Sequence, residues 1–361
     1  MSTRSRIRVL HVESGQEWRA TRDQVRLLVE ALTGVPHVRQ AVATLKGSRL
    51  AREVGILGVP VLPLPWTTDS DPRALRRLAR AASADWDVLH AHDSQALRML
   101  LYILALDGAN APVVASRRLS GLPQGRWKWR RARMVLAISP RARLDLLAVG
   151  VEAQRVVVVP NGIDVSTLHP QRAGEIRSRV GARPENLLIG SSAGLESDRD
   201  HGTLIEAAAR VCAARPGVRF ALLGEGSERG RLETRIGRLG LGGRVCLPGH
   251  VPGARHSMVD FDVFVHPSRS EELSTAALEA LGAGVPLVTT VEEPGDRFRD
   301  TGIAPVPPGD IDALAAALLG LVDDRERRTA AGLAAMRFAE AHGSRAMVEG
   351  TLAAYETVAR R

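Results

Sequence analysis

Two glutamates on either side of an expected helix start are the residues most suited to chemistry. Glu271 and Glu279 are separated by seven residues in "EELSTAALE", which follows a strand-like segment at 262–268. Two carboxylates accept hydrogen bonds from four hydroxyl groups, so the pair suits a polyol ligand. Because Ser274 or Thr275 is a good N-cap, we expect Glu271 in the preceding loop and Glu279 in the early helix.

The backbone between these glutamates offers a second kind of chemistry. A helix start carries unpaired amides and the positive end of the helix dipole, and both favour phosphate. We therefore expect a diphosphate to face the amides of Glu272, Leu273, Ser274 and Thr275. The alternative is that the first glutamates lie in a solvated loop and the last one only complements the helix dipole.

A further group of polar residues ends a strand-like segment in the amino-terminal half. The motif "HAHD" places His90, His92 and Asp93 at the end of "WDVLHAH". Polar side chains at the carboxyl end of a parallel strand are candidates for lining a ligand cleft. For His90, a buried imidazole with satisfied hydrogen bonds is an equal alternative.

Short apolar segments alternate with helix-length patterns along the chain, which predicts an α/β fold with parallel sheets covered on both faces. The strand-like segments comprise "IRVLHV", "VRQAVATL", "VPVLPLP", "WDVLHAH", "PVVAS", "MVLAIS", "VVVVPNGID", "NLLIGSSAG", "RFALLGEG", "RVCLPGHV", "DVFVHPS", "VPLVTT" and "IAPVPPGD". An irregular connector at 161–170 divides them into two doubly wound, Rossmann-like sheets. We expect domains at 1–165 and 166–342, with a helix at 343–361 crossing back to the first domain.

Composition narrows the classes of partner. The net charge is +9 and almost all of the positive charge is arginine, which favours anionic ligands such as nucleotides or anionic lipid. Aromatic residues make up only 3%, without a stacking platform, so we expect no nucleic-acid partner. Neither the two cysteines nor the "DWD" at Asp85 to Asp87 forms a metal-binding pattern, and we expect turn or cap roles for the aspartates.

Location is a separate expectation. The amino-terminal "MSTRSRIRVLHV" lacks the apolar core of a secretion signal, so we expect a cytoplasmic protein. Arg73, Arg76, Arg77 and Arg80 recur at i, i+3, i+4 and i+7, and "GRWKWRRAR" at 125–133 adds tryptophans and more charge. Such a face suits an anionic membrane surface, which predicts peripheral association with the inner membrane face. A solvated helix is the alternative.

At this point the chain resembles a known family, the retaining family 4 glycosyltransferases with the GT-B fold. The resemblance covers nearly the whole chain. It is carried by "LHAHD", "VVVVPNGID", "LLGEGSERGRLE", "VFVHPSRSEELSTAALEALGAGVPLV" and "PPGDIDALAAAL". It implies that Glu271 faces the donor sugar, that Glu279 binds the ribose, and that no metal or other cofactor holds the diphosphate.

The sequence departs from the family pattern at three places. Family members carry a Gly-Gly pair in the first loop, where "GQEWRATRDQ" has Ala20-Thr21 and only Gly15 lies nearby. Where they hold the diphosphate with Arg and then Lys, this chain has Gly194 and Arg199.

The third departure is Arg118, which stands where many relatives have a histidine beside the transferred sugar. With Glu271, His92 and Asp93, it completes the expected catalytic group. Glu279, Arg199, Gly194, Gly15 and the amides of 272–275 form the expected donor group.

The expected function is retaining transfer of a sugar from a nucleoside diphosphate sugar to a hydroxyl acceptor in envelope glycan or glycolipid synthesis. Two alternatives stay open. One is a catalytically silent nucleotide-sugar-binding relative, and the other is a GT-B nucleotide-sugar epimerase, because a fold does not fix a reaction.

Overall fold

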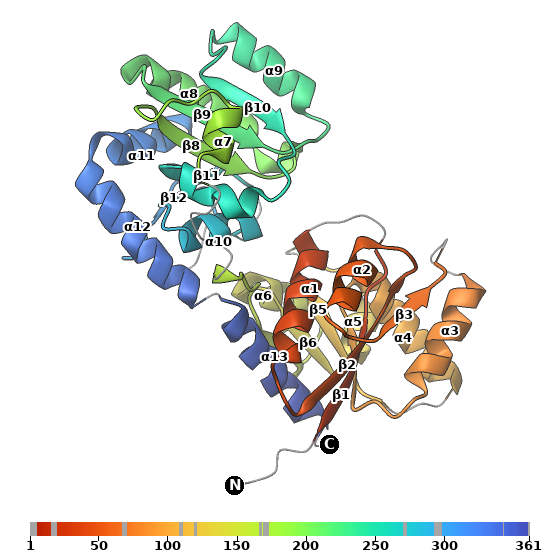
Figure 1. Ribbon diagram of the computed structural model, residues 1–361. Coiled ribbons are helices and arrows are strands. Elements are labelled where there is room, and N and C mark those ends of the chain that lie inside the picture. The colour runs from red at the N-terminus through yellow and green to blue at the C-terminus, as the bar shows by residue number, and fades with distance from the viewer. Residues whose placement is uncertain are drawn as a thin grey trace. The chain divides into compact units, whose positions relative to one another are not determined.

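The computed structural model describes residues 6–15, 20–66, 71–107, 111–118, 121–165, 168, 173–269, 273–291, 298–341 and 343–359. The chain divides into two compact units (Figure 1). Unit 1 comprises Met1–Gly162 with Ser344–Arg361, and unit 2 comprises Ile163–Gly343. The chain therefore passes between the units twice, at 162–163 and at 343–344.

Unit 1 contains a parallel sheet with the strand order β3-β2-β1-β4-β5-β6-β7 in the described residues. Its strands are β1 (Ile7–Val12), β2 (Val38–Leu45), β3 (Val61–Leu64), β4 (Val88–Ala91), β5 (Val113–Arg117), β6 (Met134–Ala137) and β7 (Val156–Val158). Its helices are α1 (Ala20–Thr33), α2 (Arg49–Ile56), α3 (Pro72–Ala82), α4 (Ser94–Asp107), α5 (Arg126–Arg131), α6 (Pro140–Ala148) and α13 (Ser344–Ala359).

Helices cover both faces of this sheet, as the near-continuous apolar strands require. One apolar core joins the sheet to α1 and α13, and another joins the opposite face to α3, α4, α5 and α6. Helix α1 shows how the spacing of apolar residues determines which side of a helix is buried. Val25, Leu28, Val29 and Leu32 recur at helical spacing and are at most 1% exposed, so one stripe of the helix packs inward.

Unit 2 contains a second parallel sheet, with the order β10-β9-β8-β11-β12-β13. Its strands are β8 (Leu187–Ser192), β9 (Val218–Leu223), β10 (Val245–Gly249), β11 (Val263–His266), β12 (Leu287–Thr289) and β13 (Ile303–Pro305). Its helices are α7 (Glu175–Arg179), α8 (His201–Ala214), α9 (Arg229–Arg238), α10 (Thr275–Gly282), α11 (Ile311–Asp323) and α12 (Arg325–Glu340). Separate apolar cores lie on the α8, α9 and α11 face and on the α7, α10 and α12 face.

The strand order reverses once in each sheet, between β1 and β4 in unit 1 and between β8 and β11 in unit 2. At such a point the loops after the two strands diverge to opposite faces and leave a ligand crevice at the carboxyl ends. We call these two places the β1/β4 and β8/β11 switch points. The predicted α/β fold with two doubly wound parallel sheets is confirmed.

Two smaller features complete the fold. Asp85 and Asp87 both pair with Arg8 at the start of β1, and Asp87 accepts from the Arg8 amide at 2.7 Å. The aspartates thus lie in the turn between α3 and β4, as one of the two expected roles has it, and from there they anchor β1. Within the described residues, no helix is both long and apolar enough to span a bilayer.

Candidate active site

At the β8/β11 switch point, two loops lie against each other. The amide of Arg269, after β11, donates to the carbonyl of Asp198, after β8, at 2.9 Å. In the same place Arg199 Nη1 donates to Ser268 Oγ at 3.4 Å. Hydrogen bonds between the loops thus place the guanidinium of Arg199 over the carboxyl ends of both strands.

Arg199 is only weakly held by acidic neighbours. Its Nε lies 3.6 Å from Asp198 Oδ2, and its side chain is 32% exposed while that of Asp198 is 60% exposed. Exposed ion pairs of this kind contribute only about 0 to 1 kcal/mol. Among the described residues, most of the positive charge of Arg199 is therefore not compensated.

Two buried histidines lie near this guanidinium. Burial, with the Arg199 charge as a further cause, lowers the pKa of His201 to about 4 and that of His266 to about 3. Both imidazoles are therefore neutral at pH 7. Neither nitrogen of His201 has a hydrogen-bond partner in the described part of the chain, and His266 Nε2 also lacks one. Buried polar atoms are normally paired, so these nitrogens are candidates for hydrogen bonds to a ligand or to water.

Two helix starts complete this site. Ser274 is the N-cap of α10, since its Oγ accepts from the Ala277 amide at 3.2 Å. Thr275 follows as the first helical residue, and its buried Oγ1 has no partner among the described residues. Helix α8 begins after Asp200, which has a φ of 45° and makes no side-chain cap. Both starts offer backbone amides that suit an anion.

The remaining residues of the expected donor group differ in where they lie in the structure. Glu271 and Glu272 lie outside the described residues. Leu273 is half-buried just before the N-cap, and Glu279 is half-buried in the second turn of α10. Gly194 has room for a side chain, because an added Cβ would lie 3.7 Å from its closest neighbour, the Cγ of Glu196. Steric crowding therefore does not explain the glycine.

At the β1/β4 switch point, parallel pairing sets His11 on β1 beside His90 on β4. His92 follows two residues later on the same face, and its Nε2 lies 2.9 Å from His11 Nδ1. His90 Nδ1 lies 2.6 Å from the hydroxyl of Tyr355 on α13, and its Nε2 lies 2.9 Å from Ser116 Oγ. All three imidazoles are buried. Sequence reasoning missed His11, because only the strand register shows its neighbours.

The electrostatics of this histidine cluster favour neutral rings. Burial lowers the pKa of His11 to about 4 and those of His90 and His92 well below the usual value, with Arg118 as a further cause for the last two. Their nitrogens come within 4.8 Å of one another, as metal ligands would. Since both nitrogens of His90 are bonded and Arg118 opposes a cation, we interpret the cluster as a hydrogen-bonded network.

Asp93 acts on its surroundings through four short hydrogen bonds. Its Oδ1 accepts from Ser14 Oγ at 2.7 Å and from the amides of Gln95 and Ala96 at 2.9 and 2.8 Å. Its Oδ2 accepts from the Ser14 amide at 2.7 Å. Asp93 thus caps α4 and holds the loop after β1, so it positions the site.

The loop after β1 is also closed by an ion pair. Arg22 Nε lies 2.9 Å from Glu13 Oε1, which also accepts from the Gly15 amide at 3.1 Å. Burial and the neighbouring Asp93 charge raise the pKa of Glu13 to about 7. A Cβ at Gly15 would fall 1.0 Å from Arg22 Nη2, so this glycine makes room for the guanidinium.

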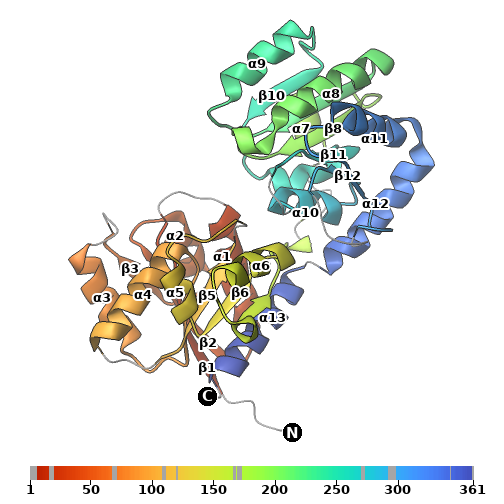
Figure 2. The ribbon, with the colours of Figure 1, turned by 180° about the vertical axis from the view of Figure 1, so that it is seen from behind.

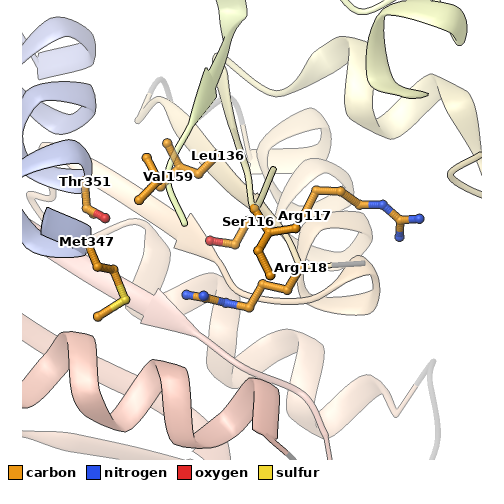
Figure 3. A pocket seen from close by; sticks show the side chains of 8 residues that line it. Ser116, Arg117, Arg118, Leu136, Val159, Met347 and Thr351 are labelled. Carbon is orange, nitrogen blue, oxygen red and sulfur yellow. The ribbon is translucent and has the colours of Figure 1, made fainter. Parts of the chain in front are cut away.

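Arg118 follows β5 and points toward α13, whereas Arg117 points the opposite way (Figure 3). Its Nη1 donates to Asn161 Oδ1 at 2.9 Å, while its buried Nε has no partner among the described residues. Burial lowers its pKa to about 10, so it stays charged at pH 7.

A small hollow of about 10 Å³, enough for about one water molecule, lies beside this guanidinium. Its lining includes Arg118, Ser116, Val159, Met347 and Thr351.

The chain leaves unit 1 beside this hollow. Gln24 of α1, buried to 1% exposure, donates to the carbonyl of Gly162 and accepts from its amide, both at 2.9 Å. A Cβ at Gly162 would lie 3.0 Å from Ser344 Cα. Gln24 thus fixes the first crossing between the units, and that crossing lies against the second at Ser344, a role for Gln24 that no sequence motif indicated.

The structure therefore sorts the expected site residues into two groups. Arg199, Gly194, Leu273, Ser274, Thr275 and Glu279 belong to unit 2. Gly15, His92, Asp93 and Arg118 belong to unit 1. The unit 2 group offers a cation, helix-start amides and one described carboxylate, and the unit 1 group offers a cation and neutral imidazoles.

Family comparisons cover nearly the whole chain. Residues 12–167 match the family model described as Glycosyltransferase Family 4, and residues 173–337 match Glycosyl transferases group 1. A relative described as putative glycosyltransferase EpsF of Bacillus subtilis is 27% identical, covering 79% of each chain. The phosphatidyl-myo-inositol mannosyltransferase of Mycolicibacterium smegmatis is also 27% identical, over 83% of this chain and 80% of its own.

A solved structure agrees with the fold. Anabaena Alr3699/HepE, crystallised with UDP, superposes with a TM-score of 0.81 at 19% identity, over 98% of this chain and all of the other. The same protein has also been solved with UDP-glucose.

Proposed function

Since this chain belongs to the family 4 glycosyltransferases of the GT-B fold, we propose that it transfers a sugar from a nucleoside diphosphate sugar to a hydroxyl acceptor, with retention. One observation carries the donor half of the proposal. Arg199, two neutral histidines with nitrogens unpaired among the described residues, and the starts of α8 and α10 converge at the β8/β11 switch point. That combination suits a diphosphate.

We assign the sugar hydroxyls of the donor to the two glutamates. Glu279 lies in the second turn of α10, beyond the helix start. With the diphosphate at the start, we assign the ribose hydroxyls to Glu279 and the transferred sugar to Glu271. UDP and UDP-glucose bound to the Anabaena structural neighbour support a donor of this class.

The reaction then needs no protein base. The bond between the anomeric carbon and the phosphate oxygen breaks, and the acceptor hydroxyl bonds to the same face of the sugar. The hydroxyl proton passes to the departing phosphate oxygen, so atoms and charges balance. Arg199 and the helix starts stabilise the charge that builds up on the diphosphate. We propose that these groups do so without a metal.

We assign binding of the acceptor to unit 1. Arg118 keeps an unpaired Nε beside the hollow, and His92 Nδ1 is likewise buried without a partner in the described residues. These groups suit hydroxyl or phosphate groups of an envelope glycan or glycolipid. The phosphatidylinositol acceptor in the name of the Mycolicibacterium relative supports a lipid-linked acceptor.

The test begins with thermal shifts for UDP, GDP, ADP and their sugar conjugates, since a ligand stabilises by mass action. The best conjugate is then incubated with envelope glycan and glycolipid fractions. We expect nucleoside diphosphate release only when an acceptor is present, and a product with the anomeric configuration of the donor. Release without acceptor, sugar isomerisation, or binding without turnover would contradict the proposal.

A further inference from the structure

Three neighbouring helices of unit 1 carry an unusually one-sided charge. Together α3, α4 and α5 contain nine Arg or Lys residues and one acidic residue, Asp107. Helix α4 packs against both α3 and α5, and all three lie in front of the sheet in Figure 2. They therefore form one layer, which we call the α3–α5 layer.

The charges of this layer are directed outward. Helix α3 buries Ala74, Leu78 and Ala82 against the core, while its four arginines are exposed. On α5 the outward residues are Arg126, Arg130 and Arg131. This amphipathic pattern leaves seven exposed arginines on one layer, although Arg73 pairs with Asp71 at 3.2 Å and Arg130 Nε donates to the Val149 carbonyl at 2.7 Å.

Exposed aromatic and aliphatic groups lie among these charges. Tyr102 of α4 is 53% exposed and Trp127 of α5 is 40% exposed, with ring centroids 5.6 Å apart. Leu106, one turn beyond Tyr102, is 84% exposed. Trp and Tyr with an apolar neighbour and basic flanks are typical of groups that enter the interface of a bilayer.

Helix α5 is anchored, so Trp127 is held outward. Its other tryptophan, Trp129, is only 1% exposed and its Nε1 donates to the Gln124 carbonyl at 3.3 Å. Lys128 is buried and donates to Ser94 Oγ at 2.5 Å. The neighbouring side chains thus fix the helix and leave one ring for a partner.

We propose that the α3–α5 layer docks on an anionic lipid bilayer. The seven exposed arginines complement a negative surface, and Trp127, Tyr102 and Leu106 supply groups for the interfacial region. The proposal rests on the proposed function only in placing a lipid-linked acceptor at that surface. A nucleic acid or an acidic protein is disfavoured as the partner, because an aliphatic side chain as exposed as Leu106 gains little from a polar polyanion.

The test is co-sedimentation of the full chain with phosphatidylcholine vesicles, with or without phosphatidylglycerol, at low and physiological salt. We expect binding only to the anionic vesicles, weakening as salt screens the charges. The triple change Arg76→Gln, Arg77→Gln and Arg80→Gln should lower affinity at least tenfold. The matched triple change on α12, at Arg325, Arg327 and Arg337, removes equal charge from exposed sites in unit 2 and should leave binding unchanged.

Two further readouts keep the outcome decisive. Brominated lipid should quench tryptophan fluorescence in the wild type, and Trp127→Phe should remove most of that quenching. Equal binding to neutral vesicles, equal loss in both triple variants, or tighter binding to duplex DNA than to vesicles would overturn the proposal. Nucleoside diphosphate binding by the α3 variant should match the wild type, which separates failure of this proposal from failure of the donor site.

Discussion

The two switch points differ in which of their polar groups are paired within the described residues. At β1/β4, His11 Nε2, His92 Nδ1 and Arg118 Nε lack partners there, but the groups between them are paired. At β1/β4, His90 is bonded to Tyr355 and Ser116, and Asp93 accepts from Ser14 and from the start of α4. At β8/β11, both nitrogens of His201 lack partners within the described residues, and the side chain of Arg199 makes long contacts there, of 3.4 Å to Ser268 and 3.6 Å to Asp198.

This difference indicates a division of labour. Paired polar groups rigidify a site, whereas unpaired ones are costly until a ligand satisfies them. We infer that the paired residues of unit 1 hold a fixed geometry around a few unpaired polar groups. In unit 2, we infer that the donor supplies many of the hydrogen bonds that the polar groups need. Ligands should therefore stabilise unit 2, and substitutions in the unit 1 network should affect folding first.

The largest expected effect is that of Glu271→Gln on turnover. Loss of charge-assisted hydrogen bonds to the reacting sugar, worth about 1.5 to 3 kcal/mol, should lower kcat/KM roughly 10- to 150-fold. Nucleoside diphosphate affinity should change little. Glu272→Gln is the matched control, because it keeps the backbone amide and should retain activity. Equal turnover in the wild type and the Glu271 variant would remove Glu271 from the donor site.

Tyr355→Phe should mainly reduce stability. The change leaves His90 Nδ1 buried without its 2.6 Å partner, so the free energy of unfolding should fall by about 1 to 3 kcal/mol. Urea denaturation measures this, and nucleoside diphosphate binding should persist. Tyr102, the other tyrosine of the chain, is exposed, so Tyr102→Phe should leave the free energy of unfolding unchanged. A destabilisation shared by both variants would argue against the network.

Glu279→Gln should distinguish binding of the ribose from binding of the diphosphate. If Glu279 binds the ribose, affinities for the nucleoside and the nucleoside diphosphate should fall together, by roughly three- to tenfold. Calorimetric titration of both ligands measures the two losses. A loss confined to the diphosphate would instead place Glu279 near the phosphates.

The smallest expected effect is on pH dependence. The pKa of His201 is lowered to about 4 in the fold, so the unfolded chain binds more protons between that pH and its usual value of about 6.5. Stability from this group is fully present above pH 6.5 and is lost as the pH falls toward 4.

The loss should amount to about 1 kcal/mol between pH 6.5 and 5.5. Denaturation series of the wild type and His201→Gln at those two pH values should differ in slope by that amount. Parallel slopes would show that His201 titrates alike in both states.

Much of the fold follows from local sequence. Apolar runs such as "VVAS" and "VFVH" predict the strands, because a strand buried on both faces needs apolar residues throughout. Ser274 as a choice of N-cap is equally local. The short helix α5 was not predicted, because six residues with four basic groups give little helical periodicity. Its stability depends on the burial of Trp129.

The site is less predictable, because its contacts join distant parts of the chain. His11 and His92 are 81 residues apart, and Tyr355 is 265 residues from His90. Gly15 resembles a ligand-facing glycine in the sequence, and only the structure shows that Arg22 fills the space that its Cβ would take. Such roles depend on register and packing that no short motif records.

The most direct test is to titrate the wild type, Arg199→Ala and Arg118→Ala with the preferred nucleoside diphosphate and with its nucleoside. We predict that Arg199→Ala weakens the diphosphate at least tenfold, about 1.4 kcal/mol, and leaves the nucleoside unchanged. Arg118→Ala, which removes a cation from the other switch point, should bind both ligands as the wild type does. A smaller loss for the diphosphate, an equal loss for the nucleoside, or a larger loss in Arg118→Ala would contradict a diphosphate site at β8/β11.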